Sequence, residues 1–265
     1  MPRVDRPTYP GVCSPQISRR TTSNSFRACL SGVTARASTC CGCAPGLPGP
    51  AILHLHGGAW VRFGRWAPAN VFLARAGFVT VSADYRLAPG AIFPAQLGDV
   101  GEAVTWLRAN AGAWQLDPAR LGAWGVSAGA HLAALLGTGA GTRGEPAVQA
   151  VGNVSGPMDF FDPALSFGPE PFPLLGGPWA ERQALAAQAS PVRHVSGRSA
   201  PFLHLHGLHD DEVPASQARR MHAALRAAGV PSELALLDGG HYVNDTHRAE
   251  IEARLIDFFR RELGH

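Results

Sequence analysis

The sequence predicts an α/β protein in which helices cover both faces of a mostly parallel central sheet. Short apolar runs alternate along the chain with segments of helical periodicity, and this alternation is typical of parallel sheets. The chain has 265 residues, of which 46% are hydrophobic, and both values suit one domain of ordinary size. Glycine-rich motifs follow four of the apolar runs, and parallel sheets place their chemistry on loops at those strand ends.

Six apolar runs are predicted as strands because they are short, rich in aliphatic residues and followed by turn residues. They comprise residues 51–56, 77–83, 121–126, 148–154, 201–206 and 233–237. Apolar residues at helical spacing predict five helices. These comprise residues 68–76, 95–111, 128–136, 216–228 and 250–262. Residues 157–180, rich in Pro, Gly and Phe, are predicted to form an irregular insertion.

The start of the chain differs in composition from the remainder. Residues 1–45 contain six arginines, one acidic residue and all five cysteines, whereas all 11 histidines lie beyond them. We therefore divide the chain into an unassigned Arg-, Ser- and Cys-rich segment, residues 1–46, and one folded domain, residues 47–265. The segment is expected to be disordered or non-native, the latter through a start read in the wrong frame. Its composition also resembles that of an organellar transit peptide.

Charge and cysteine usage argue against several function classes. All 23 basic residues are scattered arginines, so no nucleic-acid-binding stripe is predicted. No run of 18 apolar residues occurs, so no membrane span is predicted. Cys40 and Cys43 form one C-x-x-C pair, which supplies only two of the four ligands that zinc prefers, and no metal site is expected there. We expect a cytoplasmic protein, and the sequence leaves its oligomeric state open.

The segment GVSAG at residues 125–129 matches the pattern Gly-x-Ser-x-Gly between a predicted strand and a predicted helix. A tight turn there would push the side chain of Ser127 out above the sheet, and glycine on both sides avoids backbone clashes. The helix behind Ser127 begins with free N–H groups and a partial positive charge. A glycine-rich turn with a serine cap is the structural alternative, but the placement between strand and helix favours a nucleophile.

The segment HGGAW at residues 56–60 directly follows another predicted strand. Its two glycines, Gly57 and Gly58, leave backbone N–H groups free to point at a developing negative oxygen, which is how a tetrahedral intermediate is stabilised. A plain strand-ending turn is the alternative. The position of this loop upstream of a nucleophile favours the functional interpretation.

A carboxylate is predicted on the loop HGLHDDEVP, residues 206–214, which follows a further strand. A buried carboxylate in this place would fix a histidine tautomer and stabilise its imidazolium. Three carboxylates are available, and the residues alone do not select one. They are Asp210, Asp211 and Glu212.

A general base is predicted on the loop GGHY, residues 239–242, which follows the next strand. A histidine on a glycine loop can reach toward a nucleophile, although a lone histidine is more often a surface or core residue. The chain order of Ser127, then an acid, then His241 is the order of the α/β-hydrolase triad. This agreement of order and strand-end placement favours His241 as the base.

Taken together, these motifs resemble those of carboxylesterases in the α/β-hydrolase superfamily. The branch is that of hormone-sensitive-lipase-like and BD-FAE-type (bifunctional deacetylase/feruloyl esterase) enzymes, and the resemblance covers about residues 47–265. The motifs are HGGAW (56–60), ADYRLAP (83–89), FPAQLGDV (93–100), WGVSAGAHLAALLG (124–137), LHGLHDDEVP (205–214) and GGHY (239–242).

The resemblance implies an α/β-hydrolase fold and a serine esterase that cleaves small, aryl or acetyl esters through an acyl-enzyme. The implied triad consists of Ser127, Asp210 and His241, with Asp211 as the reserve acid. The implied oxyanion hole consists of the backbone N–H groups of Gly57, Gly58 and Ala128. The expected partner is a small-molecule ester, and enzymes of this type need neither a metal ion nor an organic cofactor.

Three features depart from the family pattern. HGGG reads HGGA here, followed by Trp60, and HGGxW also occurs in kynurenine-formamidase-like relatives, so an amide substrate is an alternative. Val126 stands where these esterases often have an acidic residue. Two antiparallel strands normally precede the HGG strand, but the best candidate, residues 29–39, is poor. A chain without these strands would have an exposed sheet edge, and an inactive, truncated hydrolase is a further alternative.

Aromatic side chains are candidates for the substrate pocket, and the insertion at residues 157–180 is predicted to form a lid or pocket wall. The pocket candidates are Trp60, Phe160, Phe161 and Tyr242, with Phe167 and Phe172 as further members. For each of them, ordinary core packing is the alternative. A metallohydrolase is a rival function, because residues two apart on a strand share a face. Its ligands would be His54, His56, His204, His206 and His209.

Overall fold

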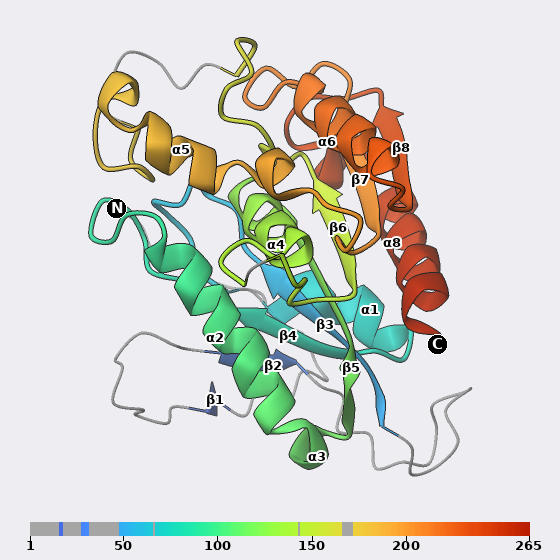
Figure 1. Ribbon diagram of the computed structural model, residues 1–265. Coiled ribbons are helices and arrows are strands. Elements are labelled where there is room, and N and C mark those ends of the chain that lie inside the picture. The colour runs from blue at the N-terminus through green and yellow to red at the C-terminus, as the bar shows by residue number, and fades with distance from the viewer. Residues whose placement is uncertain (1–15, 18–27, 32–47, 66, 143, 166–171) are drawn as a thin grey trace, which may run out of the picture.

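The computed structural model describes residues 16–17, 28–31, 48–65, 67–142, 144–165 and 172–265, and an eight-stranded sheet forms the centre of this part of the chain (Figure 1). The strands are β1 (Gln16–Ile17), β2 (Ala28–Ser31), β3 (Gly49–Leu55), β4 (Val79–Ala83), β5 (Leu116–Val126), β6 (Ala150–Val154), β7 (Phe202–Gly207) and β8 (Ser232–Leu237). Their order in the sheet is β1-β2-β4-β3-β5-β6-β7-β8. The strands from β4 to β8 in this order are parallel, which confirms the predicted fold class.

Two short strands from the first 46 residues extend the sheet beyond β4. β2 pairs antiparallel with β4, and β1 pairs antiparallel with β2. The sequence left open whether these strands are missing or irregular, and the structure has them with two and four residues. Their shortness agrees with the lack of longer apolar runs in this segment. The edge of β4 is therefore paired rather than uncovered, while Cys40 and Cys43 lie outside the described residues.

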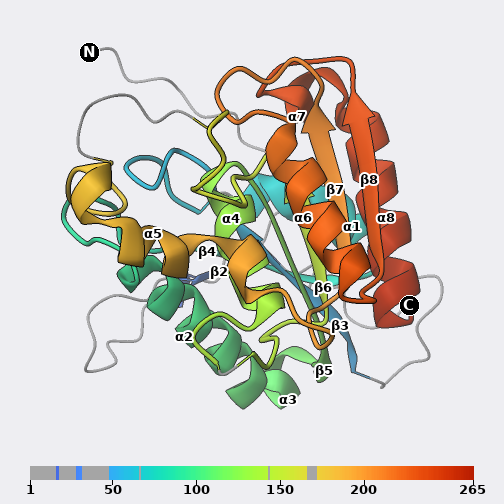
Figure 2. The same cartoon turned by 45° about the horizontal axis from the view of Figure 1, so that its top comes forward.

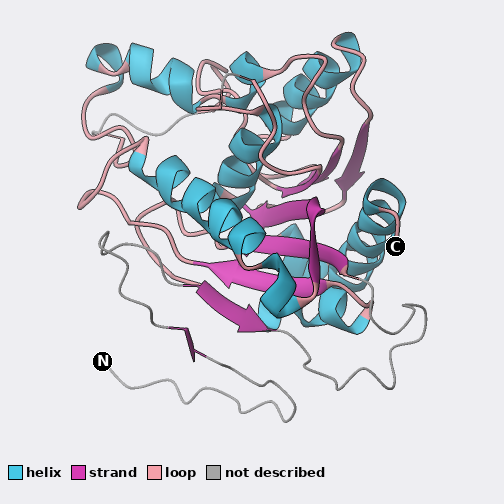
Figure 3. Ribbon diagram, turned by 60° about the horizontal axis from the view of Figure 1, so that its bottom comes forward, coloured by secondary structure: helices cyan, strands magenta, loops and turns pink. Residues whose placement is uncertain are grey.

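Helices cover both faces of the sheet, as predicted, and Figure 3 shows the strands between them. Helices α2 (Ala95–Ala109), α4 (Ala128–Thr138) and α6 (Ser216–Ala227) contribute to one buried apolar cluster, and α1 (Val71–Arg75) and α8 (Arg248–Leu263) contribute to the other. Figure 2 shows α6, β7, β8 and α8 side by side at one edge of the molecule. The longer helices are α2 (Ala95–Ala109), α4 (Ala128–Thr138), α6 (Ser216–Ala227) and α8 (Arg248–Leu263). The shorter helical segments are η1 (Ala67–Asn70), α1 (Val71–Arg75), α3 (Ala111–Trp114), η2 (Trp179–Glu181), α5 (Gln183–Ala189), η3 (Pro191–His194) and α7 (Val243–Thr246).

The central strands are apolar on both sides because each side faces a helical layer. On β3, Leu53 and Leu55 belong to the cluster that contains α4, whereas Ile52 belongs to the cluster that contains α8. All three are fully buried. Burying a large apolar side chain of this kind is worth roughly 1.5–3 kcal/mol. Packing on both sides therefore holds the central strands in place, and with them the strand ends where the candidate site residues lie.

Two glycines let helix α8 lie close against the sheet. A Cβ atom on Gly122 of β5 would lie 2.7 Å from the Phe259 ring, and one on Gly152 of β6 would lie 2.6 Å from the Leu255 side chain. Both distances are shorter than real Cβ contacts, so a larger residue at either position would force the facing side chains to move. The small residues on β5 and β6 thus set the distance between sheet and helix.

Several helical segments are not predicted from the sequence. The segments α5, η3 and α7 have seven, four and four residues. Each is too short for helical periodicity to be recognised in the sequence. β5 also begins five residues earlier than predicted, at Leu116 instead of residue 121. Among the described residues, no helix combines the length and the apolar character needed to cross a membrane.

Candidate active site

Ser127 occupies a strained turn between β5 and α4. Its φ and ψ angles are 55° and −121°, which a residue with a side chain rarely adopts. The turn is held because the Ser127 N–H donates to Val154 O at 2.9 Å and the Ser127 carbonyl accepts from the His131 N–H at 3.1 Å. Glycine is required beside it, since a Cβ on Gly129 would lie 2.0 Å from Leu55 O. The turn exposes the Ser127 hydroxyl at the carboxyl edge of the sheet.

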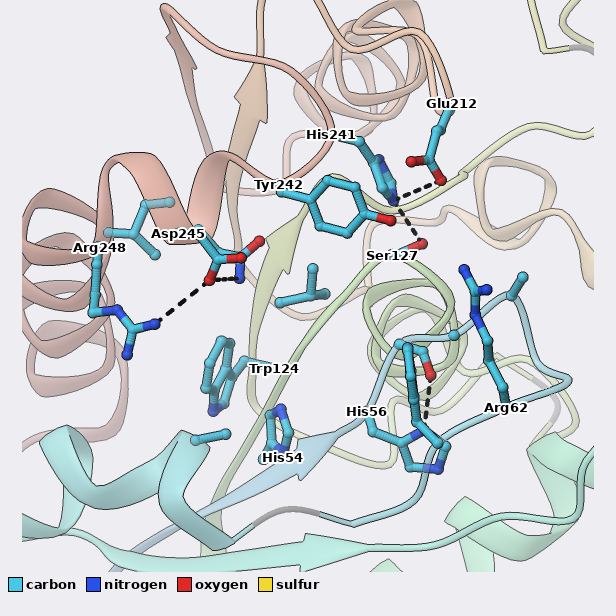
Figure 4. A pocket seen from close by; sticks show the side chains of 18 of the residues that line it. His54, His56, Arg62, Trp124, Ser127, Glu212, His241, Tyr242, Asp245 and Arg248 are labelled. Carbon is cyan, nitrogen blue, oxygen red and sulfur yellow. Dashed lines mark hydrogen bonds and ion pairs between the residues drawn. The ribbon is translucent and has the colours of Figure 1, made fainter. Parts of the chain in front are cut away.

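A histidine and a carboxylate reach Ser127 from two other strand ends. His241 Nε2 lies 3.1 Å from Ser127 Oγ, and Figure 4 draws this contact as a dashed line. On the other side of the same ring, Nδ1 lies 2.8 Å from Asp210 Oδ2. With the proton on Nδ1, the ring donates to Asp210 and accepts from the Ser127 hydroxyl. The structure therefore brings together three residues that lie 83 and 31 positions apart.

Asp210 is buried, and both oxygens of its carboxylate have hydrogen-bond partners. Oδ1 accepts the N–H groups of Glu212 and Val213 at 3.0 and 2.8 Å, and His206 Nε2 lies 3.3 Å from Oδ2. Burial alone would raise the pKa of Asp210, but hydrogen bonds from His206, His241 and the Val213 N–H outweigh it and hold the pKa well below its usual range. The carboxylate is therefore charged at every working pH. It faces His241 as a permanent acceptor.

The other two carboxylates of the loop belong to exposed residues, unlike Asp210. Asp211 is exposed, and no hydrogen bond or ion pair is found for its side chain among the described residues. The carboxylate of Glu212 is half exposed and lies 3.9 Å from His241 Nε2, on the nucleophile side of the ring. Glu212 also raises the pKa of Tyr242, through its charge and a hydrogen bond. The sequence offered Glu212 as one of three candidate acids and His206 as a candidate metal ligand, but it did not predict that His206 would lie beside Asp210 or Glu212 beside His241.

The predicted oxyanion donors lie around Ser127. A Cβ on Gly57 would lie 3.6 Å from the Cβ of Ser127, so the glycine loop passes directly beside the nucleophile. Gly58 has a φ of +103°, and a Cβ there would lie 2.4 Å from Arg62 O, so this position requires glycine. Within the described part of the chain, the N–H groups of Gly57, Gly58 and Ala128 donate no hydrogen bond. They are free to bind a negative oxygen.

Ser127 and His241 open onto a cavity of about 320 Å³. Its walls come from the loop after β3, the segment after β8 and helix α8, as Figure 4 shows. The apolar lining includes Phe63, Phe72, Trp124, Val126 and Ile251, and the polar lining includes Arg62, Glu212, Asn244, Asp245, Arg248 and Glu252. A cavity of this size and mixed lining suits a small organic substrate.

Three of the four predicted pocket aromatics do not line this cavity. Trp60 and Phe160 are buried, and they pack edge-on against each other with ring centroids 6.1 Å apart. The Trp60 Nε1–H also donates to His131 Nδ1 at 3.2 Å, which satisfies its polar group inside the core. Phe161 stacks under the Arg193 guanidinium instead. Of the four candidates, only Tyr242 is found in the cavity lining, and its side chain is exposed.

The described part of the insertion at residues 157–180 does not line the cavity either. Its residues pack against α4 and α6: Met158 N–H, for instance, donates to Gln217 Oε1 at 2.7 Å. Phe172 belongs to the same buried cluster as Trp60. The described part of the predicted lid or pocket wall thus forms no wall of this cavity, and Phe167 lies outside the described residues. The walls come instead from shorter loops that sequence reasoning passed over.

The histidines of the rival metallohydrolase have protein partners. His204 Nδ1 lies 2.8 Å from the Asn153 amide, and His206 Nε2 donates to Val213 O at 2.7 Å. His209 is exposed beside Asp238. Among the described residues, no group of three or more side chains of metal-ligand type gathers around one point. His204 and His206 are therefore buried core residues, each hydrogen-bonded to the protein through one ring nitrogen.

Buried histidines predict a loss of stability in mild acid. Burial lowers the pKa of His54 and His204 to about 3 and that of His131 to about 4. The unfolded chain takes up these protons near pH 6.5 and the folded chain does not, so the stability falls as the pH drops from 7 toward 4. Urea unfolding at pH 7 and pH 5 should differ by about 1–2 kcal/mol for each histidine. The exposed His209, replaced by Gln, should leave this difference unchanged, and an equal stability at both pH values would contradict the prediction.

Comparison with known proteins identifies the family of the chain. The family model BD-FAE matches residues 45–225, which is more than half of the chain. The chain belongs to the BD-FAE family. The matched residues of this BD-FAE member include Ser127 and Asp210 and end before His241.

The relatives of this BD-FAE member include proteins named esterases. It is 32% identical to Esterase LipQ of Mycobacterium tuberculosis over 80% of this chain and 54% of LipQ. It is also 32% identical to Esterase LipC of the same organism, over 69% of this chain and 50% of LipC. The chain thus spans about half the length of these relatives. A truncated carbohydrate esterase from gut microbiota shares the fold, with a TM-score of 0.76, 24% identity and coverage of 98% and 99% of the two chains.

Proposed function

We propose that the chain is a serine hydrolase that cleaves small carboxylic esters through Ser127, His241 and Asp210. The observation that supports this most strongly is the 3.1 Å contact between Ser127 Oγ and His241 Nε2 at the wall of the cavity. The names of LipQ and LipC support ester hydrolysis as the class of reaction. Because the chain spans only half of those relatives, the activity itself is part of the proposal.

The first half of the reaction forms an acyl-enzyme. His241 Nε2 takes the hydroxyl proton of Ser127 while Oγ attacks the carbonyl carbon of the ester. The carbonyl oxygen becomes negative and accepts the N–H groups of Gly57, Gly58 and Ala128, and each such donor is worth about 3–4 kcal/mol in related hydrolases. The C–O bond to the alcohol then breaks, and the alcohol leaves with the proton from His241.

The second half of the reaction uses water in the same way. His241 takes a proton from water, the hydroxide attacks the acyl carbon, and the same N–H groups bind the second oxyanion. The bond to Ser127 Oγ breaks, the acid leaves, and Ser127 recovers its proton from His241. In both halves, the charged Asp210 holds the ring and stabilises the imidazolium.

A hydrolysis panel tests the substrate class. We expect the chain to cleave p-nitrophenyl acetate faster than long-chain p-nitrophenyl esters, because the cavity of about 320 Å³ accommodates small groups. Acetylated sugar, methyl ferulate and N-formylkynurenine complete the panel, and a preference for N-formylkynurenine would assign an amide hydrolase instead. A chelator should leave the rates unchanged.

A fluorophosphonate probe tests whether the site is active at all. The probe should label one serine per chain, and the labelled peptide should contain Ser127, because only an activated hydroxyl attacks phosphorus at a useful rate. Cooperatively folded protein that fails to react with the probe would support the alternative of an inactive hydrolase.

A further inference from the structure

The direction of the candidate oxyanion donors depends on two peptide groups. The N–H of Gly57 belongs to the same peptide as the carbonyl of His56, and the N–H of Gly58 belongs to the same peptide as the carbonyl of Gly57. In a planar trans peptide the N–H and C=O bonds point in opposite directions. Any group that holds these two carbonyls therefore also aims the two N–H groups.

Tyr85 holds the first carbonyl. Its hydroxyl donates to His56 O at 2.8 Å and lies 3.4 Å from Gly57 O. Burial raises the pKa of Tyr85 well above its usual range, so the hydroxyl keeps its proton and remains a donor. Tyr85 is buried and is not part of the cavity lining. It approaches the glycine loop from behind rather than from the substrate side.

The ring of His56 holds the second carbonyl. Its Nδ1 lies 2.8 Å from Gly57 O, and Figure 4 marks this contact with a dashed line at His56. Because a carbonyl only accepts, the proton must be on Nδ1, and burial lowers the pKa of His56, which favours this neutral form. The His56 ring is stacked on Tyr85, with centroids 4.2 Å apart and planes 8° from parallel. The two donors thus form one rigid unit.

The backbone next to Tyr85 is held in place by the hydrogen bonds of Arg86. The Arg86 N–H donates to Asp99 Oδ2 at 2.8 Å, and the Arg86 guanidinium donates to both oxygens of the same carboxylate. Asp99 is buried on helix α2. The Ala88 N–H also donates to Trp60 O at 2.8 Å, which ties the segment after β4 to the glycine loop a second time.

We propose that Tyr85 is a positioning residue for ester hydrolysis. Its hydroxyl, together with the Nδ1–H of His56, holds the two peptides of the glycine loop so that the Gly57 and Gly58 N–H groups face the substrate carbonyl. The inference rests on the proposed function, and it gives the motif ADYRLAP a role in the reaction beyond packing. It predicts that the hydroxyl of Tyr85 matters in the transition state and not in substrate binding.

The variant Tyr85→Phe tests the proposal because it retains the stacked ring and removes only the donor. For p-nitrophenyl acetate, we expect kcat to fall by about 10- to 100-fold, less than the loss of a whole oxyanion donor, with KM changed by less than about 2-fold. Inhibition by a trifluoromethyl ketone, which forms a tetrahedral adduct with serine, should weaken by a similar factor. Unchanged kcat and unchanged inhibition would overturn the proposal, and so would a loss confined to KM.

Two further sets of variants separate positioning from folding. Thr138→Val removes another buried hydroxyl that donates to a backbone carbonyl, at the far end of α4, and should leave kcat unchanged. His56→Asn keeps a donor near the Nδ1 position and should retain more of kcat than His56→Leu; equal losses in both variants would count against the proposal. Failure of the wild-type chain to cleave any ester would remove the proposed function itself. Normal wild-type activity with an unaffected Tyr85→Phe variant would remove only this inference.

Discussion

Replacing Ser127 with alanine should abolish the hydrolysis of p-nitrophenyl acetate. The variant loses the hydroxyl that lies 3.1 Å from His241 Nε2, and no acyl-enzyme can form. In serine hydrolases the loss of the nucleophile costs about 10⁶-fold in kcat. Initial rates measured with pure protein at high concentration would detect such a fall, and the fluorophosphonate label should vanish with the activity. Retention of activity would refute Ser127 as the nucleophile.

Ser155 supplies the matched control for this substitution. It is a buried serine just beyond the end of the neighbouring strand β6, and its φ of 51° resembles the 55° of Ser127. It does not line the cavity. Ser155→Ala should therefore keep its activity within about 2-fold, since a change that leaves the reacting groups in place alters kcat little. Equal losses in the two variants would point to the fold and not to the nucleophile.

Replacing Asp210 with asparagine should be almost as damaging to kcat. The amide keeps the shape of the side chain but removes the charge, and it can donate to His241 Nδ1, which then favours the wrong tautomer. The analogous change in serine proteases lowers kcat by about 10⁴-fold. Because the amide nitrogen would also replace the oxygen that faces His206 Nε2, circular dichroism must show that the variant is folded.

Asp211→Asn is the matched control for the acid. It makes the same chemical change on the neighbouring residue, whose side chain is exposed. We expect wild-type kcat within about 2-fold, because exposed groups away from the reacting atoms contribute little. If Asp211→Asn were the more damaging change, the acid of the triad would have to be reassigned.

The positions of residues that directly follow a strand could be predicted from the sequence. Ser127, Asp210 and His241 each follow a short apolar run, and a parallel sheet brings such strand ends to one edge. The choice of Asp210 over its neighbours needed the resemblance to a family. In the structure, burial and the contact with His241 distinguish it from Asp211.

The residues that line the cavity could not be predicted in the same way. An aromatic residue next to a glycine loop has the same pattern whether it faces substrate or core, and Trp60 turns inward because His131 accepts its Nε1–H. Arg62 and Arg248 carry no motif, yet they belong to the lining. Their place depends on how the loop after β3 and the segment after β8 approach each other in space, which one sequence does not record.

The short strand pair at the start of the chain shows the same limit. Strands of two and four residues have too few positions for an alternation of apolar and polar residues to be visible. The position of β2 is set by its pairing with the edge of β4. The pairing is a property of the assembled sheet rather than of the segment.

The close approach of helix α8 to Gly122 and Gly152 identifies two positions for protein engineering. The same helix contributes Ile251 and Glu252 to the cavity wall, so its depth against the sheet sets the width of the cavity. We expect an alanine at position 122 to press on the Phe259 and Ile52 side chains, and so to change the packing of α8, without replacing any residue of the cavity lining. A change in the acceptance of bulkier esters would then come from the packing behind the cavity wall, through a residue that a screen of lining residues would not sample.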